Sequence, residues 1–324
     1  MACGIVATCL LLAGFVRAPT LISSQPLGGR QQSGSGVISQ DVRLVLLPVT
    51  VTDRKGEFVS GLEASNFQVY EDGRLQQISL FRHEDVRVTV GLAVDHSGSM
   101  AAKADQVIQG AVAFVQASNP QDREFVVNFD ETPTFSLPSN VKFTSNVADL
   151  RAALSTAYAS GRTALFDAVA AALEHFDQND PDKKVILLIS DGGDNASRHT
   201  FAQVLRTAQS SNVVIYAIGL LDEHDADQNP GVLRKIAKDT GGQAYFPNSA
   251  AEIVSVCRQI AADIRHQYTL GYDPPQNGRS VYRKTRVTVH APGKRGLVVR
   301  TRPGYFFPGT ATTPEPATRH EEGR

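Results

Sequence analysis

The chain has 324 residues, 42% of them hydrophobic and 20% charged, which is enough apolar sequence to fold around one large core or two smaller ones. Its 32 basic and 33 acidic residues give a formal net charge of −1 at pH 7. This near balance argues against a nucleic-acid-binding surface or a polybasic membrane patch, so charge alone identifies no partner.

The amino-terminal segment predicts export from the cell. Residues 1–18 read "MACGIVATCLLLAGFVRA" and combine an apolar stretch with small residues at the positions that a signal peptidase prefers. We interpret them as a signal peptide that directs the protein to a secreted or periplasmic location. An uncleaved anchor is the alternative, but the apolar stretch is shorter than the ~20 residues that a membrane span needs.

Polar sequence borders the expected folded part at both ends. Residues 19–40 are rich in Gly, Ser and Gln and predict a flexible leader, and residues 309–324 are expected to form a disordered tail. Cleavage after Ala18 would leave Cys257 as the single cysteine of the mature chain, so no intramolecular disulfide is expected. Cys257 lies in the helical pattern "AEIVSVCRQIAADI", where we expect it to be a buried small hydrophobic residue.

Residues 41–85 and 266–308 both carry the pattern of β-strands. In residues 41–85, short apolar or alternating runs are separated by the turn sequences "DRKG" and "EDG". Residues 266–308 contain three candidate strands, "QYTLGYDPP", "RSVYRKTRVTVHAP" and "GLVVRTRPGYF". Neither segment has enough strands for a stable sandwich, whereas together they offer about six. We therefore expect the two segments to pair into one small β-sandwich-like domain.

Residues 86–265 alternate strands with helices. Four apolar strands, "VRVTVGLAV", "REFVVNF", "KVILLIS" and "VVIYAIG", are separated by segments whose apolar residues recur at helical spacing. Strands that are apolar almost throughout are typical of a parallel sheet covered by helices on both faces. The sequence thus predicts a doubly wound α/β domain with a mainly parallel sheet, inserted between the two halves of the β domain.

Polar residues follow two of these strands at their carboxyl ends, where open α/β sheets place ligand sites. Asp95 ends the strand "TVGLAV", and Ser97 and Ser99 follow at alternate positions, so three oxygens can face one side. Asp191 follows the strand "KVILLIS", and Thr163 in "ASGRTALFDAV" begins a helix. Because Mg²⁺ binds oxygen ligands, retains water and needs only one or two carboxylates, these five residues form a candidate metal site.

The same residues have a simpler explanation. Ser and Thr before a helix are ordinary N-caps, each worth ~1 kcal/mol, and Ser97, Ser99 and Thr163 could each be no more than a cap. For each residue taken singly, the cap explanation is the stronger one. The combination of an Asp-x-Ser-x-Ser after one strand, an Asp after another and a Thr before a helix favours the metal site.

The motif "DHSGSM" resembles the Asp-x-Ser-x-Ser motif of the metal-ion-dependent adhesion site (MIDAS) in the von Willebrand factor A (VWA) family. The remaining ligands of that family match Thr163 in "GRTALFDAV" and Asp191 in "LLISDGGDN", and "AKDTGGQAYF" is similar to the glycine turn and last strand of the domain. The likeness covers about residues 86–265, and the flanks are similar to segments of secreted bacterial VWFA-related proteins. The resemblance implies a Rossmann-like VWA fold.

The resemblance also implies a function. Asp95, Ser97, Ser99 and Thr163 would coordinate the metal directly or through water, and Asp191 would act directly or from just behind the other ligands. Mg²⁺ is the expected ion, with Mn²⁺ or Ca²⁺ as alternatives. The under-neutralised dication would attract an Asp or Glu carboxylate of a protein or extracellular-matrix-like partner. We therefore expect a secreted, metal-dependent adhesion or protein-binding module, and not an enzyme.

Two other functions remain open. A metal-dependent hydrolase would use the dication to activate water, but it needs a general base beside the metal, and the sequence places no His or Glu there. A structural scaffold would bind metal weakly and only for stability.

His96, at an x position of the motif, is expected to lie on the rim with its side chain away from the metal, and Asp194 is expected to be a turn residue. Residues 222–231 lack the glycine and glutamate of an EF-hand and are expected to form a solvated loop.

Overall fold

The structure of the protein, a computed structural model, describes residues 44–83, 85–156, 160–177, 180–222, 226–276 and 281–307. The expected signal peptide, leader and disordered tail lie outside these residues and remain predictions. Within the described part of the chain, none of the helices has both the length and the hydropathy needed to cross a bilayer.

A six-stranded sheet in the order β10-β9-β8-β5-β6-β7 forms the centre of the α/β part. Its strands are parallel except for the edge strand β7, which pairs antiparallel with β6. The strands are β5 (Val88–Asp95), β6 (Arg123–Phe129), β7 (Pro133–Phe135), β8 (Lys183–Ser190), β9 (Val213–Gly219) and β10 (Ala244–Tyr245). The mainly parallel sheet predicted from the apolar runs is confirmed.

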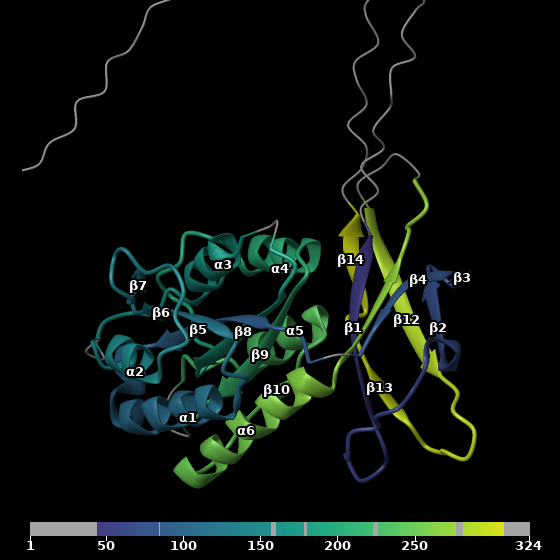
Figure 1. Ribbon diagram of the computed structural model, residues 1–324. Helices are drawn as coiled ribbons and strands as arrows, with labels where there is room; N and C mark the ends of the chain where they lie inside the picture. Colours follow the sequence, from purple (N-terminus) through teal and green to yellow (C-terminus); the bar gives the residue numbers. More distant parts are fainter. Residues whose placement is uncertain are drawn as a thin grey trace, which may run out of the picture. The chain divides into compact units, whose positions relative to one another are not determined.

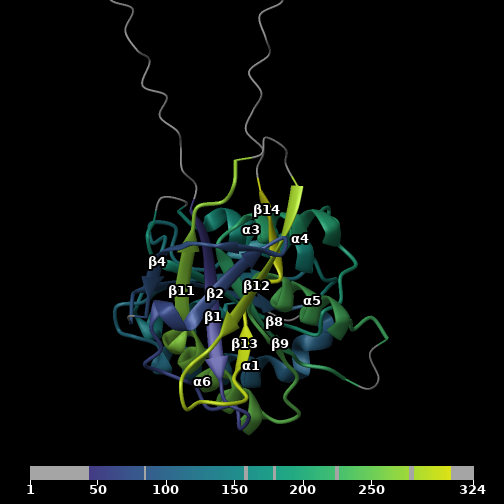
Figure 2. The ribbon, with the colours of Figure 1, turned by 90° about the vertical axis from the view of Figure 1, so that its right-hand side faces the viewer.

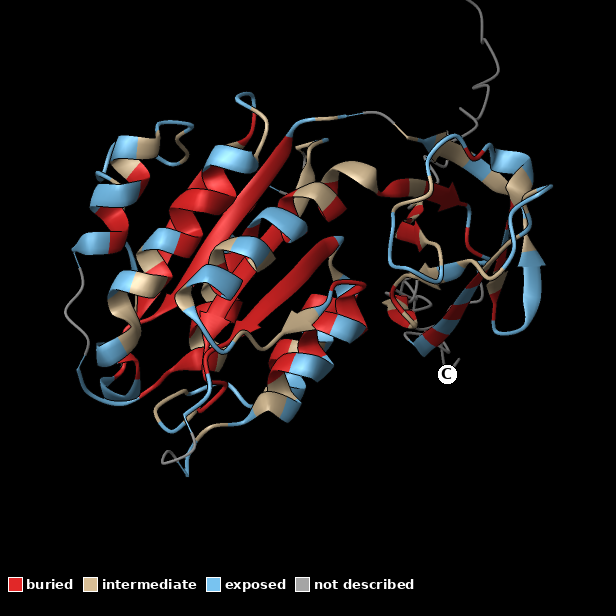
Figure 3. Cartoon of the chain, turned by 90° about the horizontal axis from the view of Figure 1, so that it is seen from below, coloured by how far each residue is buried: buried red, intermediate tan, exposed pale blue. Residues whose placement is uncertain are grey.

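Helices cover both faces of this sheet (Figure 1). One face packs against α1, α2 and α6, and the other against α3, α4 and α5. The helices are α1 (Ala104–Ala117), α2 (Val147–Ser155), α3 (Leu165–His175), α4 (Phe201–Ser210), α5 (Pro230–Thr240) and α6 (Ala250–His266), and the 3₁₀ helix η2 (Gly98–Lys103) precedes α1. All eight residues of β5 are buried, as Figure 3 shows for the central strands in red. Burial on two faces explains why these strands are apolar without alternation.

Two four-stranded antiparallel sheets form the β part, in the orders β13-β1-β11-β4 and β14-β12-β2-β3. Each sheet combines strands that precede the α/β part with strands that follow it, which lie side by side in Figure 2. The strands are β1 (Val45–Thr52), β2 (Phe67–Glu71), β3 (Arg74–Gln76), β4 (Ile78–Arg82), β11 (Tyr268–Tyr272), β12 (Val281–Val289), β13 (Val298–Arg300) and β14 (Gly304–Phe307), and the 3₁₀ helix η1 spans Ala64–Asn66.

The pairing of the two flanks confirms the sandwich predicted from the number of strands. Strand β1 runs antiparallel to β11, from Val45 opposite Tyr272 to Val49 opposite Tyr268, and β2 pairs in the same way with β12. Apolar side chains of both sheets form one buried cluster, including Leu47. Both flanks therefore contribute side chains to one shared core.

A divided strand and an additional helix are two of the places at which the structure differs from the sequence prediction. The segment "GLVVRTRPGYF" forms two strands, since β13 pairs with β1 and β14 pairs with β12 in the other sheet. Pro303 lies between them and has no N–H group to continue a ladder. Helix α5 was not predicted, although Asn229 accepts a hydrogen bond from Val232 N as its N-cap, and Gly241 ends the helix with φ +91°.

Candidate functional site

Asp95 and Asp191 lie at the carboxyl ends of the neighbouring parallel strands β5 and β8. Both residues are 2% exposed. The Asp95 carboxylate accepts a hydrogen bond from Ser190 Oγ at 2.6 Å and another from Ser97 N at 2.9 Å. Asp191 Oδ1 accepts from Gly193 N at 2.9 Å. The sheet register thus brings two buried carboxylates to one edge, as the sequence predicted.

The two serines of the motif link the loop after β5 to the loop after β8. Ser97 Oγ and Ser99 Oγ lie 3.2 Å apart, and Ser99 Oγ donates to Asp191 Oδ2 at 2.5 Å. Ser97 is 1% exposed. A continuous row of side-chain oxygens therefore runs from Ser97 through Ser99 to Asp191.

Thr163 belongs to a third loop that lies against both of the others. Ser160 N donates to His96 O at 2.8 Å, and Gly98 N donates to Gly161 O at 3.2 Å. On the other side, the carbonyl oxygen of Thr163 accepts from Asn195 N at 2.9 Å and from the following backbone N–H at 3.0 Å. Thr163 is 6% exposed. The structure thus brings all five candidate residues to three loops in mutual contact.

Helix capping does not account for the three hydroxyl groups. Ser97 is the N-cap residue of η2, but its side chain makes no capping hydrogen bond. Ser99 lies inside η2 and bonds to Asp191. The N-cap residue of α3 is Ala164, so Thr163 precedes the cap position. The simpler explanation from the sequence is therefore wrong for these residues.

The electrostatics of the cluster fit a small cation. Burial raises the pKa of Asp95 to about 6, against hydrogen bonds from Ser190 and Ser97 that lower it, and the negative charge of Asp191 raises it further. Among the described residues, no Lys, Arg or His forms an ion pair with either carboxylate. Carboxylates and hydroxyls that offer only oxygen suit Mg²⁺, and a dication would favour the ionised form of Asp95. The residues present therefore fit the metal that the motif implies.

Sequence reasoning missed two residues that support the cluster. Ser190 bonds directly to Asp95, and Asn195 Oδ1 accepts from Thr163 N at 2.9 Å. Asp194 accepts hydrogen bonds from Phe166 N and Ser197 Oγ, so this turn residue holds the first turn of α3 against the loop after β8. The polar run "SDGGDN" was a signal for these contacts, but its spacing alone does not tell which loop each side chain meets.

His96 differs from the prediction of a rim residue. It is only 5% exposed, its Nε2 atom has no hydrogen-bond partner among the described residues, and burial lowers its pKa. Its side chain lines a separate hollow together with Asn128 and Asp130. The position of His96 within the motif predicts that its side chain points away from the metal, but it does not predict whether other residues bury that side chain.

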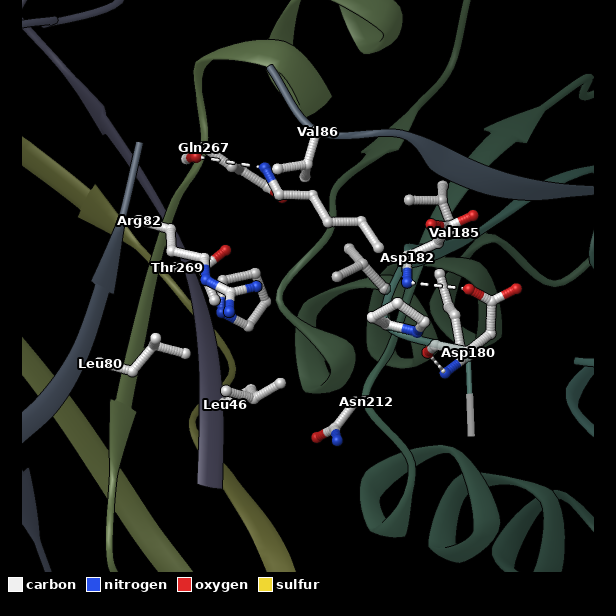
Figure 4. Close-up of a pocket in the computed structure, with 15 residues that line it drawn as sticks. Leu46, Leu80, Arg82, Val86, Asp180, Asp182, Val185, Asn212, Gln267 and Thr269 are labelled. Carbon is white, nitrogen blue, oxygen red and sulfur yellow. Dashed lines mark hydrogen bonds between the residues drawn. The ribbon is translucent and has the colours of Figure 1, made fainter. Parts of the chain in front are cut away.

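A second pocket, of about 230 Å³, is shown in Figure 4. It contains Asp180 and Asp182, but both carboxylates form ion pairs with Arg123. Lys183 also lines the pocket, and its amino group lies 3.3 Å from the carbonyl oxygen of Gln267. Burial lowers the pKa of Lys183 to about 8. Because its carboxylates are already paired, this pocket is a poorer cation site than the loops around Asp95.

In the part of the chain that the structure describes, no group of three or more His, Cys, Asp or Glu side chains could hold a metal ion. Cys257 is buried, as predicted, and is a free cysteine. The loops after β5 and β8 and before α3 therefore form the candidate metal site.

Known proteins were compared with the chain by sequence and by structure. The family model of the von Willebrand factor type A domain matches residues 90–259. The solved structure of a von Willebrand factor type A protein from Catenulispora acidiphila has a TM-score of 0.50 and 16% identity, and the match covers 72% of this chain and 71% of that one. No curated protein sequence matches the chain.

Two further solved structures are similar at lower TM-scores. The conserved hypothetical protein BatB from Bacteroides thetaiotaomicron has a TM-score of 0.46 and 18% identity over 55% of this chain and 99% of that one. Proximal thread matrix protein 1 from the mussel byssus, solved with a zinc-occupied MIDAS motif, has a TM-score of 0.48 and 17% identity over 60% of this chain and 49% of that one. Because the family model matches residues 90–259, more than half of the chain, the protein belongs to the von Willebrand factor type A domain family.

Proposed function

We propose that the protein is a secreted binding module that captures an acidic group of a partner protein through a divalent metal, with Mg²⁺ as the first candidate. The metal ligands would be Asp95, Ser97, Ser99, Thr163 and Asp191. The observation that carries the proposal is the row of oxygens in which the exposed Ser99 contacts the buried Ser97 at 3.2 Å and the buried Asp191 at 2.5 Å. Membership of the VWA family supports a role in protein interactions.

The five residues would have different tasks at the metal. Asp95 and Asp191 would supply the negative charge, and Ser190 would hold the Asp95 carboxylate in place through its 2.6 Å hydrogen bond. The serine and threonine hydroxyls would add neutral oxygens. A dication bound by only one carboxylate keeps net positive charge, and a dication bound by two is neutral but still has coordination positions that a carboxylate from outside can fill. Export rests on the sequence of residues 1–18 alone.

A hydrolytic function has less support. A hydrolase needs a general base within hydrogen-bond reach of the attacking water. Apart from the five candidates themselves, the described side chains that bond to them are those of Ser190 and Asn195, and neither is a base. Nothing in this arrangement favours catalysis over binding.

Peptide display tests the binding function directly. A library with one fixed Asp between randomised flanks would be selected on the protein in Mg²⁺ and eluted with EDTA. We expect wild type and Asp105→Ala, an exposed change on α1, to retain peptides only in Mg²⁺, and Asp95→Ala to retain none. Retention in EDTA, or equal retention by Asp95→Ala, would show that peptides bind without the proposed site.

A further inference from the structure

The pocket of about 230 Å³ in Figure 4 lies between one sheet of the β part and the starts of β8 and β9. One wall comes from β1, β4 and β11, and the other comes from the first residues of β8 and β9 and from the loop before β8. The pocket therefore lies at the amino ends of the parallel strands, whereas the candidate metal site lies at their carboxyl ends. It takes no part in the function proposed above.

The wall formed by the β part is apolar on the outer face of its sheet. At the start of β1, every second side chain belongs to the sandwich core, so Leu46 and Pro48 lie on the opposite face. The register of β1, β11 and β4 places Leu46 in line with Leu80, and Pro48 in line with Thr269 and Arg82. An antiparallel sheet with one face on a core commonly has a polar outer face. Half-buried apolar side chains at this place therefore favour a ligand with an apolar part.

The opposite wall combines apolar side chains with an ammonium group. Val185 and Val214 are 1% and 4% exposed and line the pocket beside Lys183. Lys183 Nζ lies 3.4 Å from Ile264 O and 3.3 Å from Gln267 O, which is longer than the usual N–H···O distance of about 2.9–3.0 Å. Because an ammonium has three donors, at least one of them has no acceptor in the described part of the chain. Burial lowers the pKa of this amine to about 8, so the nearby carboxylates do not compensate for its loss of water.

The charges around the pocket leave an excess of positive charge. Asp180 and Asp182 also line it, but both pair with Arg123, and Asp182 pairs with Arg87 as well. Arg82 extends into the pocket from the side opposite these carboxylates, as Figure 4 shows. It forms no ion pair with any described residue. Together with the ammonium of the other wall, this guanidinium favours an anionic ligand over a cationic one.

We propose that this pocket binds a small amphiphilic carboxylate, with its aliphatic chain between the two apolar walls and its carboxylate bound by Lys183 and Arg82. Mostly apolar walls with a few polar groups that fix the orientation of the ligand are typical of small-molecule sites. The binding requires no metal, so the inference is independent of the function proposed above.

Calorimetric titration of the protein with octanoate tests the inference. Octanol and octylammonium have the same aliphatic chain without the negative charge and are the matched probes. We expect octanoate to bind at one site, at least about tenfold more tightly than either of them. Lys183→Met and Arg82→Gln should each weaken octanoate binding about tenfold and leave octanol binding nearly unchanged. Arg54→Gln, an exposed change that does not line the pocket, should bind octanoate as wild type does.

The outcomes are decisive even if one variant does not fold. Failure of octanoate to bind, or equally tight binding of octylammonium, would overturn the inference. If Lys183→Met does not fold, the exposed change Arg82→Gln remains informative. Unchanged octanoate binding by Arg82→Gln would also overturn the inference, because the carboxylate would then bind elsewhere. Octanoate binding should be the same in Mg²⁺ and in EDTA, so failure of the metal-dependent function would leave this inference standing.

Discussion

Glu124 lies near the start of β6 with 2% of its surface exposed, and its Oε2 atom has no hydrogen-bond partner among the described residues. Burial raises the pKa of this carboxyl from 4.5 to about 7. The folded protein therefore keeps a proton that the unfolded chain has already released. Because the folded pKa is the higher one, this group destabilises the fold increasingly as the pH rises from 4.5 towards 7, and by a constant amount above that range.

Glu124→Gln should remove this pH dependence, since glutamine does not ionise. We expect the difference in the free energy of unfolding, variant minus wild type, to be about 3 kcal/mol larger at pH 8 than at pH 4.5. Urea unfolding at several pH values measures the difference, with Glu174→Gln on the exposed side of α3 as the matched control. If the stability of Glu124→Gln followed the same pH dependence as wild type, Glu124 would not be the carboxyl group whose raised pKa causes that dependence.

At the scale of single residues, the sequence predicted the candidate site better than its surroundings. Asp95 and Asp191 were predicted to meet because parallel strands end at one edge of a sheet, and the structure places them there. The burial of His96 could not be predicted, since it depends on residues at the end of β6, such as Asn128 and Phe129, that lie more than thirty positions away in the sequence. Glu124 within "REFVVNF" gave no sign of its buried position, because one polar residue in an apolar strand can face either way.

A buried network joins four strands of the β part. Glu71 on β2 accepts hydrogen bonds from Tyr272 OH at 2.6 Å and Tyr305 OH at 2.7 Å, and Arg283 forms an ion pair with it at 2.9 Å. Glu71 is 5% exposed and Arg283 1% exposed. The three partners come from the carboxyl-terminal flank, so this one carboxylate holds the two flanks together.

Glu71→Ala should destabilise the protein by about 3–5 kcal/mol, because it removes the buried carboxylate that pairs with Arg283 and accepts hydrogen bonds from Tyr272 and Tyr305. Denaturant unfolding followed by circular dichroism measures the loss, and the exposed change Glu57→Ala should alter stability by less than about 0.5 kcal/mol. A loss below about 1 kcal/mol for Glu71→Ala would mean that the network contributes little to the stability of the sandwich.

Strand patterns predicted the elements of this network but not their contacts. Glu71 and Tyr305 are 234 positions apart, and alternation within a strand carries no information about a partner at that distance. The turn "EDG" was readable, and the structure has Asp72 and Gly73 there with φ values of 46° and 81°. Local turn chemistry was therefore predictable, whereas the choice of strand neighbours was inferred only from the shortage of strands in each flank.

At the scale of the whole molecule, the order of strands and helices was sufficient to predict an α/β sheet interrupting a β-sandwich. Helix α5 was missed because the acidic run before it suggested a loop, although the N-cap Asn229 and the terminal Gly241 were readable signals. The edge strand β7 has only three residues, which are too few to show the alternation of apolar and polar residues that is typical of a strand. The predicted domain limits and the signal peptide remain predictions.

The central claim is that the loops after β5 and β8 and before α3 bind a divalent metal. Calorimetric titration of Mg²⁺ and Mn²⁺ into the metal-stripped chain without residues 1–18 tests it most directly. We expect one site in wild type and in Asp105→Ala, and none in Asp95→Ala, whose thermal unfolding should show that it remains folded. Wild-type protein that takes up neither ion, or an Asp95→Ala variant that binds them equally well, would contradict the account.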